Sequence, residues 1–422
     1  METSEKKGFQ PCHRVKAVKQ EQTIGGHEVS LWQVTTVLPA VDLEVNGLAQ
    51  QFVNDAVPHL NEGERLDVTI RHSRTGLRWM SFLVQSRVSL NGHLQYQSAA
   101  SRTYDMISGE VISLKDLLGD SEEGWAVLSA AVKQQVNAYF PDETADPKAV
   151  DALCSKDGMC AVPFTLHGMS LVLHDQANAL YPERKTLMEV TVMYPLLRPY
   201  MTERAQAETD NAAYYKTCAL TFDDGPHPQN TPKLLDNMMA EGARVTFMLI
   251  GENIVKQRDL VQLEHDEGHA RGCHNWTHDN PGDLSADVLR SYPARCNAAL
   301  IDAIGLPPKF NRAPYGNFAP MLEARVGWPL IQWSTDAYDW SGKPTPEVFA
   351  KILREIGDGR IILCHDSMPN TPESARQSVE YLQNHGYMFL TIDELFAKDG
   401  VVLQPDIVYY RCLDGQTGKP EE

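Results

Sequence analysis

The stretch Thr221–Pro228, with the sequence TFDDGPHP, organises the C-terminal half of the chain. It follows the apolar run at 218–220 and ends in glycine and proline, which predicts a buried strand that stops at a tight loop. Asp223 and Asp224 stand where this strand ends. Adjacent carboxylates repel and desolvate each other, so the pair favours a bound cation. A solvated Asp-Asp turn is the alternative for this stretch taken alone.

Strand-like and helix-like segments alternate from this stretch onward. Seven strands are predicted, and each precedes a helical segment: 217–222, 244–249, 270–273, 309–311, 330–333, 360–363 and 388–391. The alternation predicts an α/β domain with parallel strands, a distorted (β/α) barrel. A complete barrel of this type has eight strand–helix units, and only seven are predicted here, so we expect the barrel to be incomplete or partly open. A doubly wound sheet is the alternative.

The N-terminal half has a different pattern. Residues 66–70 alternate apolar and polar, Asn91-Gly92 between two strand-like runs predicts a hairpin, and residues 125–140 have helical spacing. These features predict a smaller α+β domain. The predicted boundaries are a polar, loosely ordered segment at 1–30, the α+β domain at 31–200, a linker at 201–214, the α/β domain at 215–412 and a polar tail at 413–422.

Composition limits the partners of the chain. Its 422 residues carry a net charge of −18, which disfavours nucleic acid and anionic membrane and leaves neutral or cationic ligands and metal ions. No run of 18 apolar residues occurs, so we expect no membrane span. The N-terminal METSEKKGFQ has no apolar signal core, which indicates either a cytosolic protein or a chain without its export signal.

The eight cysteines include no Cys-x-x-Cys pair, which argues against a thiolate zinc cluster. Two disulfides are expected, Cys154–Cys160 across a short loop and Cys218–Cys412 between the ends of the second domain, although other pairings stay open.

Polar residues follow the predicted strands of the second half, where a barrel or an open sheet builds its site. In chain order they are Asp223 and Asp224, then His274 and His278 in HNWTH, Arg312 in RAPYG, Asp336 and Asp339 in DAYDW, and His365 and Asp366 in LCHD. We expect these residues to meet at one edge of the sheet.

His274 and His278 are four residues apart, so a helical turn would place both rings on one face. Two surface histidines at this spacing by chance are the alternative. With Asp224 they offer two nitrogens and one oxygen, a set that suits zinc or another borderline ion and leaves positions for water and substrate.

An attacking water needs a base, and a leaving group needs a proton. Asp223 can serve as the base, with Arg312 as the cation that holds it. His365 can supply the proton, and Asp339 can orient it. The alternatives are a surface ion pair for Arg312, a helix cap for Asp339 and a structural role for a buried His365.

These five motifs, TFDDGP, HNWTH, RAPYG, DAYDW and LCHD, resemble those of the NodB-homology polysaccharide deacetylases, carbohydrate esterase family 4. The resemblance covers about residues 215–399. It implies a distorted (β/α) barrel that hydrolyses N-acetyl, sometimes O-acetyl, groups with one divalent metal ion, Zn²⁺ with Co²⁺, Ni²⁺ or Mn²⁺ as alternatives.

Carried over residue by residue, the resemblance assigns several roles. Asp223 matches the base, and Asp224, His274 and His278 match the metal ligands. Arg312 and Asp339 match the residues that hold the base and the catalytic His365. Tyr315 matches a residue whose backbone N–H binds the oxyanion, and Trp340 and Leu363 match walls of the acetyl pocket. Asn275 departs from the usual serine or threonine, which bears on local turn bonding.

The segments 108–118 (SGEVISLKDLL) and 164–182 (FTLHGMSLVLHDQANALYP) resemble the DUF3298/DUF4163-type region that precedes this domain in some Gram-positive peptidoglycan deacetylases. That implies a secreted or cell-envelope enzyme acting on an acetylated glycan.

The expected substrate is peptidoglycan, at N-acetylglucosamine or N-acetylmuramic acid. Alternatives are a chitin-oligosaccharide deacetylase, an O-acetyl-xylan esterase and, in another class, a catalytically silent glycan-binding protein. The number of subunits stays open.

Overall fold

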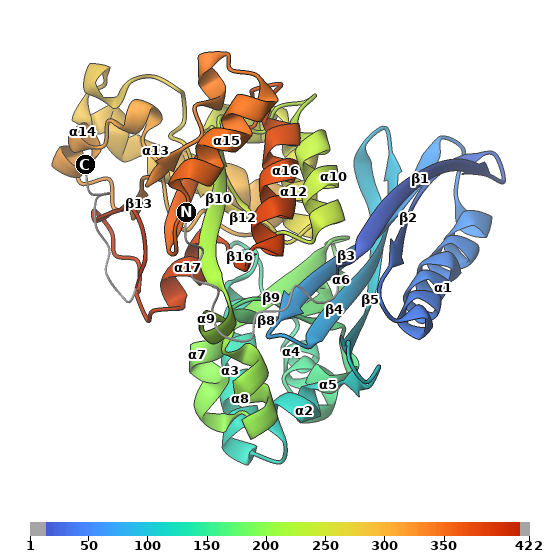
Figure 1. The fold of residues 1–422 in the computed structure, drawn as a ribbon. Coiled ribbons are helices and arrows are strands. Elements are labelled where there is room, and N and C mark those ends of the chain that lie inside the picture. The colour runs from blue at the N-terminus through green and yellow to red at the C-terminus, as the bar shows by residue number, and fades with distance from the viewer. Residues whose placement is uncertain (1–13, 414–422) are drawn as a thin grey trace. The chain divides into compact units, whose positions relative to one another are not determined.

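The chain folds as two compact units, Met1–Tyr214 with Met239–Gly242, and Tyr215–Met238 with Ala243–Glu422. The computed structural model describes residues 14–413 (Figure 1). Of the predicted terminal segments, residues 1–13, including Cys12, and residues 414–422 lie outside the described range.

The first unit contains a six-stranded sheet whose spatial order follows the sequence. All neighbouring pairs are antiparallel except β2 and β3. The strands are β1 (Lys16–Ile24), β2 (His27–Thr35), β3 (Glu64–Thr75), β4 (Trp79–Leu90), β5 (His93–Asp105) and β6 (Val111–Ile112). Helix α1 (Pro39–Ala56) packs on β2, β3 and β4. It buries Val41, Val45, Ala49 and Val53, whose spacing of four places them on one helix face.

A three-stranded antiparallel sheet and short helices complete this unit. The strands are β7 (Phe164–Leu166), β8 (Ser170–Gln176) and β9 (Leu187–Met193). The helices are α2 (Leu114–Leu118), α3 (Glu122–Ala138), α4 (Pro147–Leu153), α5 (Lys156–Ala161), α6 (Ala177–Leu180), α7 (Tyr194–Leu197), α8 (Glu203–Thr209) and α9 (Asn211–Tyr214), with 3₁₀ turns η1 (Val57–His59) and η2 (Arg198–Tyr200).

Two local predictions for this half are confirmed. Asn91 and Gly92 join β4 to β5 with φ angles of 52° and 87°, the left-handed values that a two-residue hairpin turn requires. The segment with helical spacing is α3, which begins after the Ser121 cap, whose side chain accepts from the Gly124 N–H.

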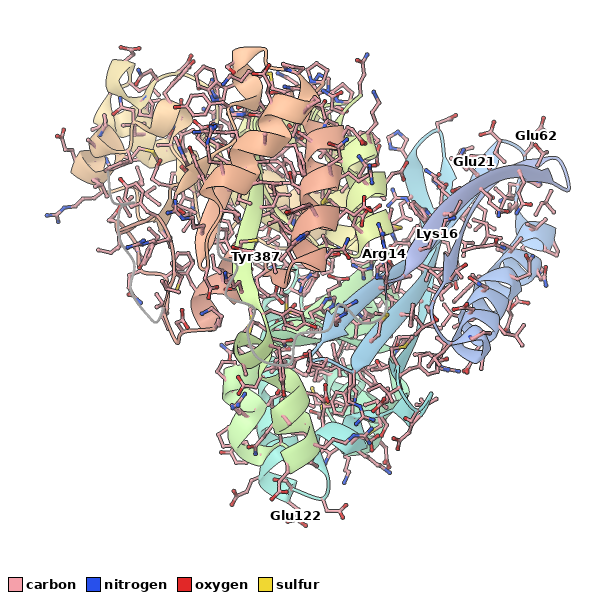
Figure 2. The ribbon with its side chains drawn as sticks, in the orientation of Figure 1. Arg14, Lys16, Glu21, Glu62, Glu122 and Tyr387 are labelled. Atoms are coloured by element: carbon pink, nitrogen blue, oxygen red, sulfur yellow. The ribbon has the colours of Figure 1, made fainter. Side chains whose placement is uncertain are left out.

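Two segments differ from the prediction. Residues 16–24, expected to be loosely ordered, form β1, an edge strand whose polar side chains face solvent. Figure 2 shows Glu21 of β1 and Glu62 extending outward from the first unit. The segment expected to be a linker carries α8 and α9. It is held by Asn211, which is buried and donates to Thr75 Oγ1 at 2.9 Å.

The second unit is a parallel sheet with helices packed around it, among them α15 and α16 (Figure 1). Its strands are β10 (Lys216–Asp223), β11 (Thr246–Leu249), β12 (Ala270–Cys273), β13 (Leu330–Ile331), β14 (Thr335–Asp336), β15 (Arg360–His365), β16 (Tyr387–Phe389) and β17 (Val408–Tyr409). The helices are α10 (Thr231–Glu241), α11 (Gly251–Lys256), α12 (Arg258–Asp266), α13 (Ala286–Ile304), α14 (Ala319–Ala324), α15 (Thr345–Glu355), α16 (Thr371–Asn384) and α17 (Ile392–Ala397), with 3₁₀ turns η3 (Pro281–Asp283), η4 (Pro314–Gly316) and η5 (Asp339–Ser341).

The strands pair in the order β12-β11-β10-β15-β14, and the first residues of β10 also pair with β16. Parallel bridges from Cys273 to Asn311 and from Asn311 to Leu330 extend this arc to β13. The alternation of strands and helices is therefore confirmed. The segment predicted as a strand at 309–311 is reduced to Asn311, which forms two isolated bridges, and the predicted strand at 330–333 shortens to the two residues of β13.

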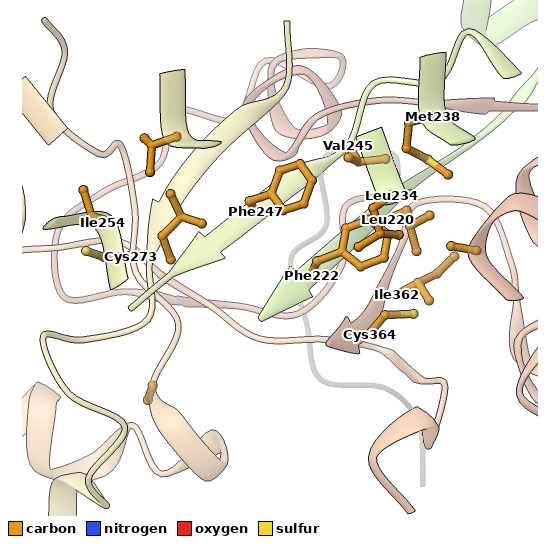
Figure 3. Packing of buried hydrophobic residues seen from close by; sticks show 14 of the residues in the cluster. Leu220, Phe222, Leu234, Met238, Val245, Phe247, Ile254, Cys273, Ile362 and Cys364 are labelled. Carbon is orange, nitrogen blue, oxygen red and sulfur yellow. The ribbon is translucent and has the colours of Figure 1, made fainter. Parts of the chain in front are cut away.

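The core of the second unit lies around β10. Figure 3 shows Phe222 of β10 and Phe247 of β11 among buried aliphatic side chains, with ring centroids 5.5 Å apart. Each fully buried ring contributes about 1.5–3 kcal/mol through the apolar surface it removes from water. The predicted buried strand is thus confirmed, and its packing fixes the point at which Asp223 leaves the core.

The two expected disulfides were wrong. Cys154, Cys160, Cys218 and Cys412 are all free thiols. Cys218 is enclosed in the middle of β10, and the Cys412 thiol donates instead to Asp399 Oδ2 at 3.4 Å. Among residues 14–413, no helix combines the length and apolar character needed to cross a membrane.

Gly272 tests how tightly the sheet is packed. A Cβ at this position of β12 would lie 2.5 Å from the Phe310 ring and 2.7 Å from Met248 Sδ, and both side chains are fully buried. We expect Gly272→Ala to destabilise the second unit by about 1–3 kcal/mol, because the ring must shift. Urea unfolding followed by circular dichroism measures this change. In the matched control Gly47→Ala, the new methyl meets open space on helix α1 and should stabilise by about 0.5–1 kcal/mol. Equal unfolding midpoints for Gly272→Ala and the parent chain would contradict the packing described.

Candidate functional site

The loop after β10 separates the two adjacent carboxylates. Asp223 is the last residue of the strand, and Asp224 follows with φ of 77°, in the left-handed region that aspartate tolerates better than most residues. The two side chains have different partners. Asp223 Oδ1 accepts from Arg312, whereas Asp224 Oδ2 accepts from the Ser367 hydroxyl at 3.0 Å.

His274 and His278 lie in the loop that follows β12, and their ring centroids are 5.1 Å apart. The rings are brought together as expected, but the predicted helical turn was wrong. Residues 276–278 form a bend, His274 and Asn275 have no regular structure, and Asn275 has φ of 59°. Asparagine populates this left-handed conformation more readily than serine or threonine, so Asn275 suits the backbone that it adopts.

Asp224, His274 and His278 form a set that could hold a metal ion. Their donor atoms all lie within 4.8 Å of one another. Asp224 Oδ1 is 3.6 Å from His274 Nε2 and 3.3 Å from His278 Nε2. This oxygen is buried and has no hydrogen-bond donor among the described residues, the condition expected of an atom reserved for a cation. The residues present therefore fit a divalent ion.

The surroundings of His274 favour the form that a metal ligand needs. Burial, together with the neighbouring His278, lowers the pKa of His274 despite the opposing charges of Asp223 and Asp224. Its Nδ1 lies 2.8 Å from the Arg312 carbonyl oxygen, so the Nδ1–H tautomer donates there and leaves Nε2 facing Asp224.

Asp223 is held by a buried ion pair. Arg312 Nη1 donates to Asp223 Oδ1 at 2.7 Å, and the Arg312 side chain has no exposed surface, so the alternative of a surface ion pair is excluded. The second oxygen of Asp223 faces the candidate ligands, with Oδ2 3.8 Å from His274 Nε2. One carboxylate oxygen is thus fixed and the other points into the site.

His365 is paired with Asp339 as predicted. His365 Nδ1 lies 2.8 Å from Asp339 Oδ1, and the His365 backbone N–H donates to Asp339 Oδ2 at 2.6 Å. Burial lowers the pKa of His365, but the hydrogen bond and charge of Asp339, with Asp223 and Asp224, outweigh it and raise the pKa to about 9. The ring is therefore an imidazolium, a proton donor, near neutral pH. Strand pairing places Asp223 of β10 beside His365 of β15.

The remaining predicted residues lie beside these groups. The Tyr315 ring meets the His278 ring edge-on at 4.8 Å, and its backbone has φ of 59°. Trp340, half exposed, follows Asp339 and packs against Tyr338 with centroids 5.4 Å apart. Leu363 is buried in β15 and pairs with Asp336.

Two predicted acids have supporting contacts. Asp366 Oδ2 accepts from the Thr231 hydroxyl at 2.6 Å, and Asp336 Oδ1 accepts from the Tyr338 N–H at 2.8 Å. Both stabilise loops around the site.

Three hydroxyl residues of the site were missed by sequence reasoning. Thr221 accepts from Arg312 Nη1 at 2.8 Å, Ser367 binds Asp224, and Thr371 donates to Asp339 Oδ2 at 2.6 Å. Thr221 and Ser367 lie within or next to recognised motifs, so proximity in sequence could have indicated them. Thr371 begins α16, and only the fold brings it to Asp339.

Comparisons with known proteins agree with this arrangement. A family model described as polysaccharide deacetylase matches residues 210–325. The chain is 35% identical over 212 residues to a peptidoglycan-N-acetylglucosamine deacetylase of Listeria monocytogenes. The aligned region covers 50% of this chain and 45% of that protein, so the chain spans about half the length of that relative.

Two further relatives are covered over more of their length. A peptidoglycan-N-acetylglucosamine deacetylase of Bacillus cereus is 31% identical over 188 residues, 42% of this chain and 67% of that protein. A chitooligosaccharide deacetylase of Bradyrhizobium is 32% identical over 161 residues, 36% of this chain and 70% of that protein. With the five motifs gathered at one edge of the second unit, these matches show that the chain belongs to the polysaccharide deacetylase family.

Proposed function

We propose that this protein is a metal-dependent hydrolase that removes N-acetyl groups from an amino-sugar polymer, with peptidoglycan as its substrate. The observation that carries the proposal is the meeting of three ligand atoms, from Asp224, His274 and His278, next to a carboxylate oxygen of Asp223. Two of the relatives described above are named for peptidoglycan, which supports this choice of polymer.

The ligand set suits one divalent ion, and Zn²⁺ fits two imidazoles and a carboxylate, with Co²⁺, Ni²⁺ and Mn²⁺ as alternatives. When bound by these three residues, such an ion would supply Lewis-acid polarisation of the acetyl carbonyl and would lower the pKa of water.

Asp223 serves as the general base. Oδ1 is engaged by Arg312, so Oδ2 is the oxygen that takes a proton from the attacking water. As the water oxygen bonds to the acetyl carbon, the backbone N–H of Tyr315 donates to the developing oxyanion. Arg312 prevents rotation of the carboxylate and keeps Oδ2 directed at the reacting atoms.

His365 serves as the general acid. Asp339 binds Nδ1, so Nε2 is the nitrogen that passes its proton to the amine as the carbon–nitrogen bond breaks. The products are acetate and a free amine on the sugar. Trp340 and Leu363 bound the space for the acetyl methyl, and the exposed rings of Trp340 and Tyr338 offer faces on which a pyranose can stack.

The wider setting is part of the proposal. The parallel arc of the second unit is the distorted, incomplete barrel that the family resemblance implies. The first unit is the DUF3298/DUF4163-like region, and the enzyme works outside the cell or at the envelope.

A chitin oligosaccharide is the second candidate substrate, favoured by the Bradyrhizobium relative. A silent glycan-binding role is a weaker candidate, because the residues of both proton transfers are in place. An O-acetylated xylan is a third candidate substrate, since hydrolysis of its esters would use the same residues.

The direct test is mass spectrometry of muropeptides after incubation of isolated sacculi with the enzyme. We expect each modified sugar to lose the mass of one acetyl group less that of the hydrogen that replaces it, together with release of acetate. Parallel assays on chitin oligosaccharides and acetylated xylan separate the candidates. Release of acetate from xylan alone would overturn the proposed substrate, and no release from any of the three would overturn the activity.

Removal of one ligand tests the metal centre. We expect His278→Ala to lower Zn²⁺ content and deacetylation by about 100-fold or more without unfolding the chain, since His278 is partly exposed. Metal analysis after dialysis, acetate release and circular dichroism measure the three quantities. The matched control is His385→Ala, another exposed histidine of the second unit, which should keep metal and activity. Full activity of His278→Ala at saturating metal would contradict the assignment.

The pH profile tests the proton donor. His365 has its pKa raised to about 9, so the active imidazolium persists below that pH and is lost as pH rises through it. In Asp339→Asn the carboxylate charge that raises the pKa is gone, so we expect the alkaline limb of kcat/KM to move to lower pH. His365→Gln should lower kcat by about 10²–10⁴-fold and abolish this limb. An unchanged alkaline limb in Asp339→Asn would assign that limb to another group.

A further inference from the structure

The first unit contains a cavity that the catalytic chemistry does not use. It has a volume of about 610 Å³, within the range of about 300–1,000 Å³ typical of small-molecule sites. It is lined by the end of helix α1, by η1 and the turn that follows it, and by strands β3, β4 and β5, and it is open to solvent on one side. Its floor is apolar and comes from Phe52, Leu60 and Val88.

A β-bulge shapes one wall of this cavity. Val88 of β4 pairs with Tyr96, and Ser89 pairs with Leu94, so Gln95 is the extra residue of β5. Successive residues of a regular strand point to opposite faces, yet Gln95 and Tyr96 both line the cavity. The bulge thus presents an amide and a half-exposed phenol ring to the same space.

The rim carries carboxylates and lacks strong cations. Asp55 and Glu64 line the cavity with His59, and there is no lysine or arginine among the residues of 14–413 that line it. Glu64 Oε2 is anchored by the Asn61 backbone N–H at 2.7 Å. Within the described part of the chain, no hydrogen bond or ion pair engages the side chains of Asp55, His59 or Tyr96, so these groups are available to a ligand.

We infer that this cavity binds an amino sugar of a deacetylated glycan, the product of the proposed function on which this inference rests. The Tyr96 ring and the apolar floor offer surfaces for the C–H face of a pyranose. Gln95 and the Ser86–Ser98 pair, whose hydroxyls are 2.7 Å apart, offer partners for sugar hydroxyls. Asp55 and Glu64 offer counter-charges for the ammonium group that deacetylation creates.

The same lining disfavours other ligands. Phosphates and anionic peptides would meet two carboxylates and no lysine or arginine, on a chain with net charge −18. A lipid chain would bury the Asp55 carboxylate without a hydrogen-bond partner. An N-acetylated sugar would fit the ring surface but could not satisfy the carboxylates with a charge. The first unit would therefore hold glycan that the enzyme has already modified.

Calorimetry with full-length protein tests this inference. The His278→Ala background prevents turnover, and the probes are the tetrasaccharides of glucosamine and of N-acetylglucosamine. We expect the glucosamine oligomer to bind at least about fivefold more tightly, with the difference shrinking in high salt. Tyr96→Ala should weaken its binding by about tenfold, and Tyr96→Phe should retain it, because the ring face is kept.

Matched variants locate the charge and the site. Asp55→Asn should weaken glucosamine binding by about threefold to fivefold, whereas Asp142→Asn, an exposed acid outside the cavity, should not. Equal affinity for the two oligomers, or unchanged binding in both Tyr96→Ala and Asp55→Asn, would overturn the inference. Acetate release by the parent enzyme is measured separately, so loss of the binding site and failure of the proposed activity give different results.

Discussion

The buried side chain of Arg312 ties the site together. Its guanidinium donates to Asp223 Oδ1, to Thr221 Oγ1 and to the Ile331 carbonyl oxygen, and its own carbonyl oxygen lies 2.8 Å from His274 Nδ1. One residue thus connects β10, β13 and the loop after β12. A guanidinium without exposed surface is stable only when its donors are satisfied, and removing one partner of such a buried pair costs about 3–5 kcal/mol. The positions of the proposed base, Asp223, and of one candidate ligand, His274, are therefore fixed by the same requirement.

This constraint explains why two neighbouring aspartates can have different roles. Asp223 continues the strand and must point toward Arg312, while the left-handed backbone of Asp224 turns its carboxylate toward the histidines. The left-handed conformation is unfavourable in free energy for most residues, and it persists where the surrounding contacts stabilise it. Ser367 provides one of these contacts by binding Asp224 Oδ2.

Much of this site could be predicted from the sequence because its residues follow strands. Carboxyl ends of parallel strands meet at one edge, so Asp223, Asp224, His274, His278, Arg312, Asp339 and His365 were expected to converge, and they do. The path between His274 and His278 was not predictable, since a spacing of four suits a helical turn as well as a loop with a left-handed residue at Asn275. Disulfides could not be predicted, because they depend on distances in space that the spacing of cysteines in the sequence does not give.

The contact between the Thr371 hydroxyl and Asp339 was not predictable either, because it depends on the packing of α16. The helices within 201–214 were missed because a polar composition gives no sign that Asn211 is buried against Thr75.

The hydrogen bonds of the site follow one rule. Asp223, Asp224, His274 and His365 each have one polar atom bonded to the protein, by Arg312, Ser367, the Arg312 carbonyl oxygen and Asp339 respectively. The other polar atoms are Oδ2 of Asp223, Oδ1 of Asp224 and Nε2 of both histidines, and none of them has a hydrogen bond within the described range.

A side chain with both polar atoms bonded would be held in place but unable to react. One with neither atom bonded would rotate away from the reacting atoms. Engaging one atom of each group fixes its direction before substrate arrives, so little reorganisation is needed when charge develops. The charges match this arrangement, because Arg312 offsets the charge of Asp223, the proposed base, while Asp339 keeps a proton on His365 near neutral pH. A proton acceptor and a proton donor can then coexist on adjacent strands, β10 and β15, without exchanging their proton before the reaction begins.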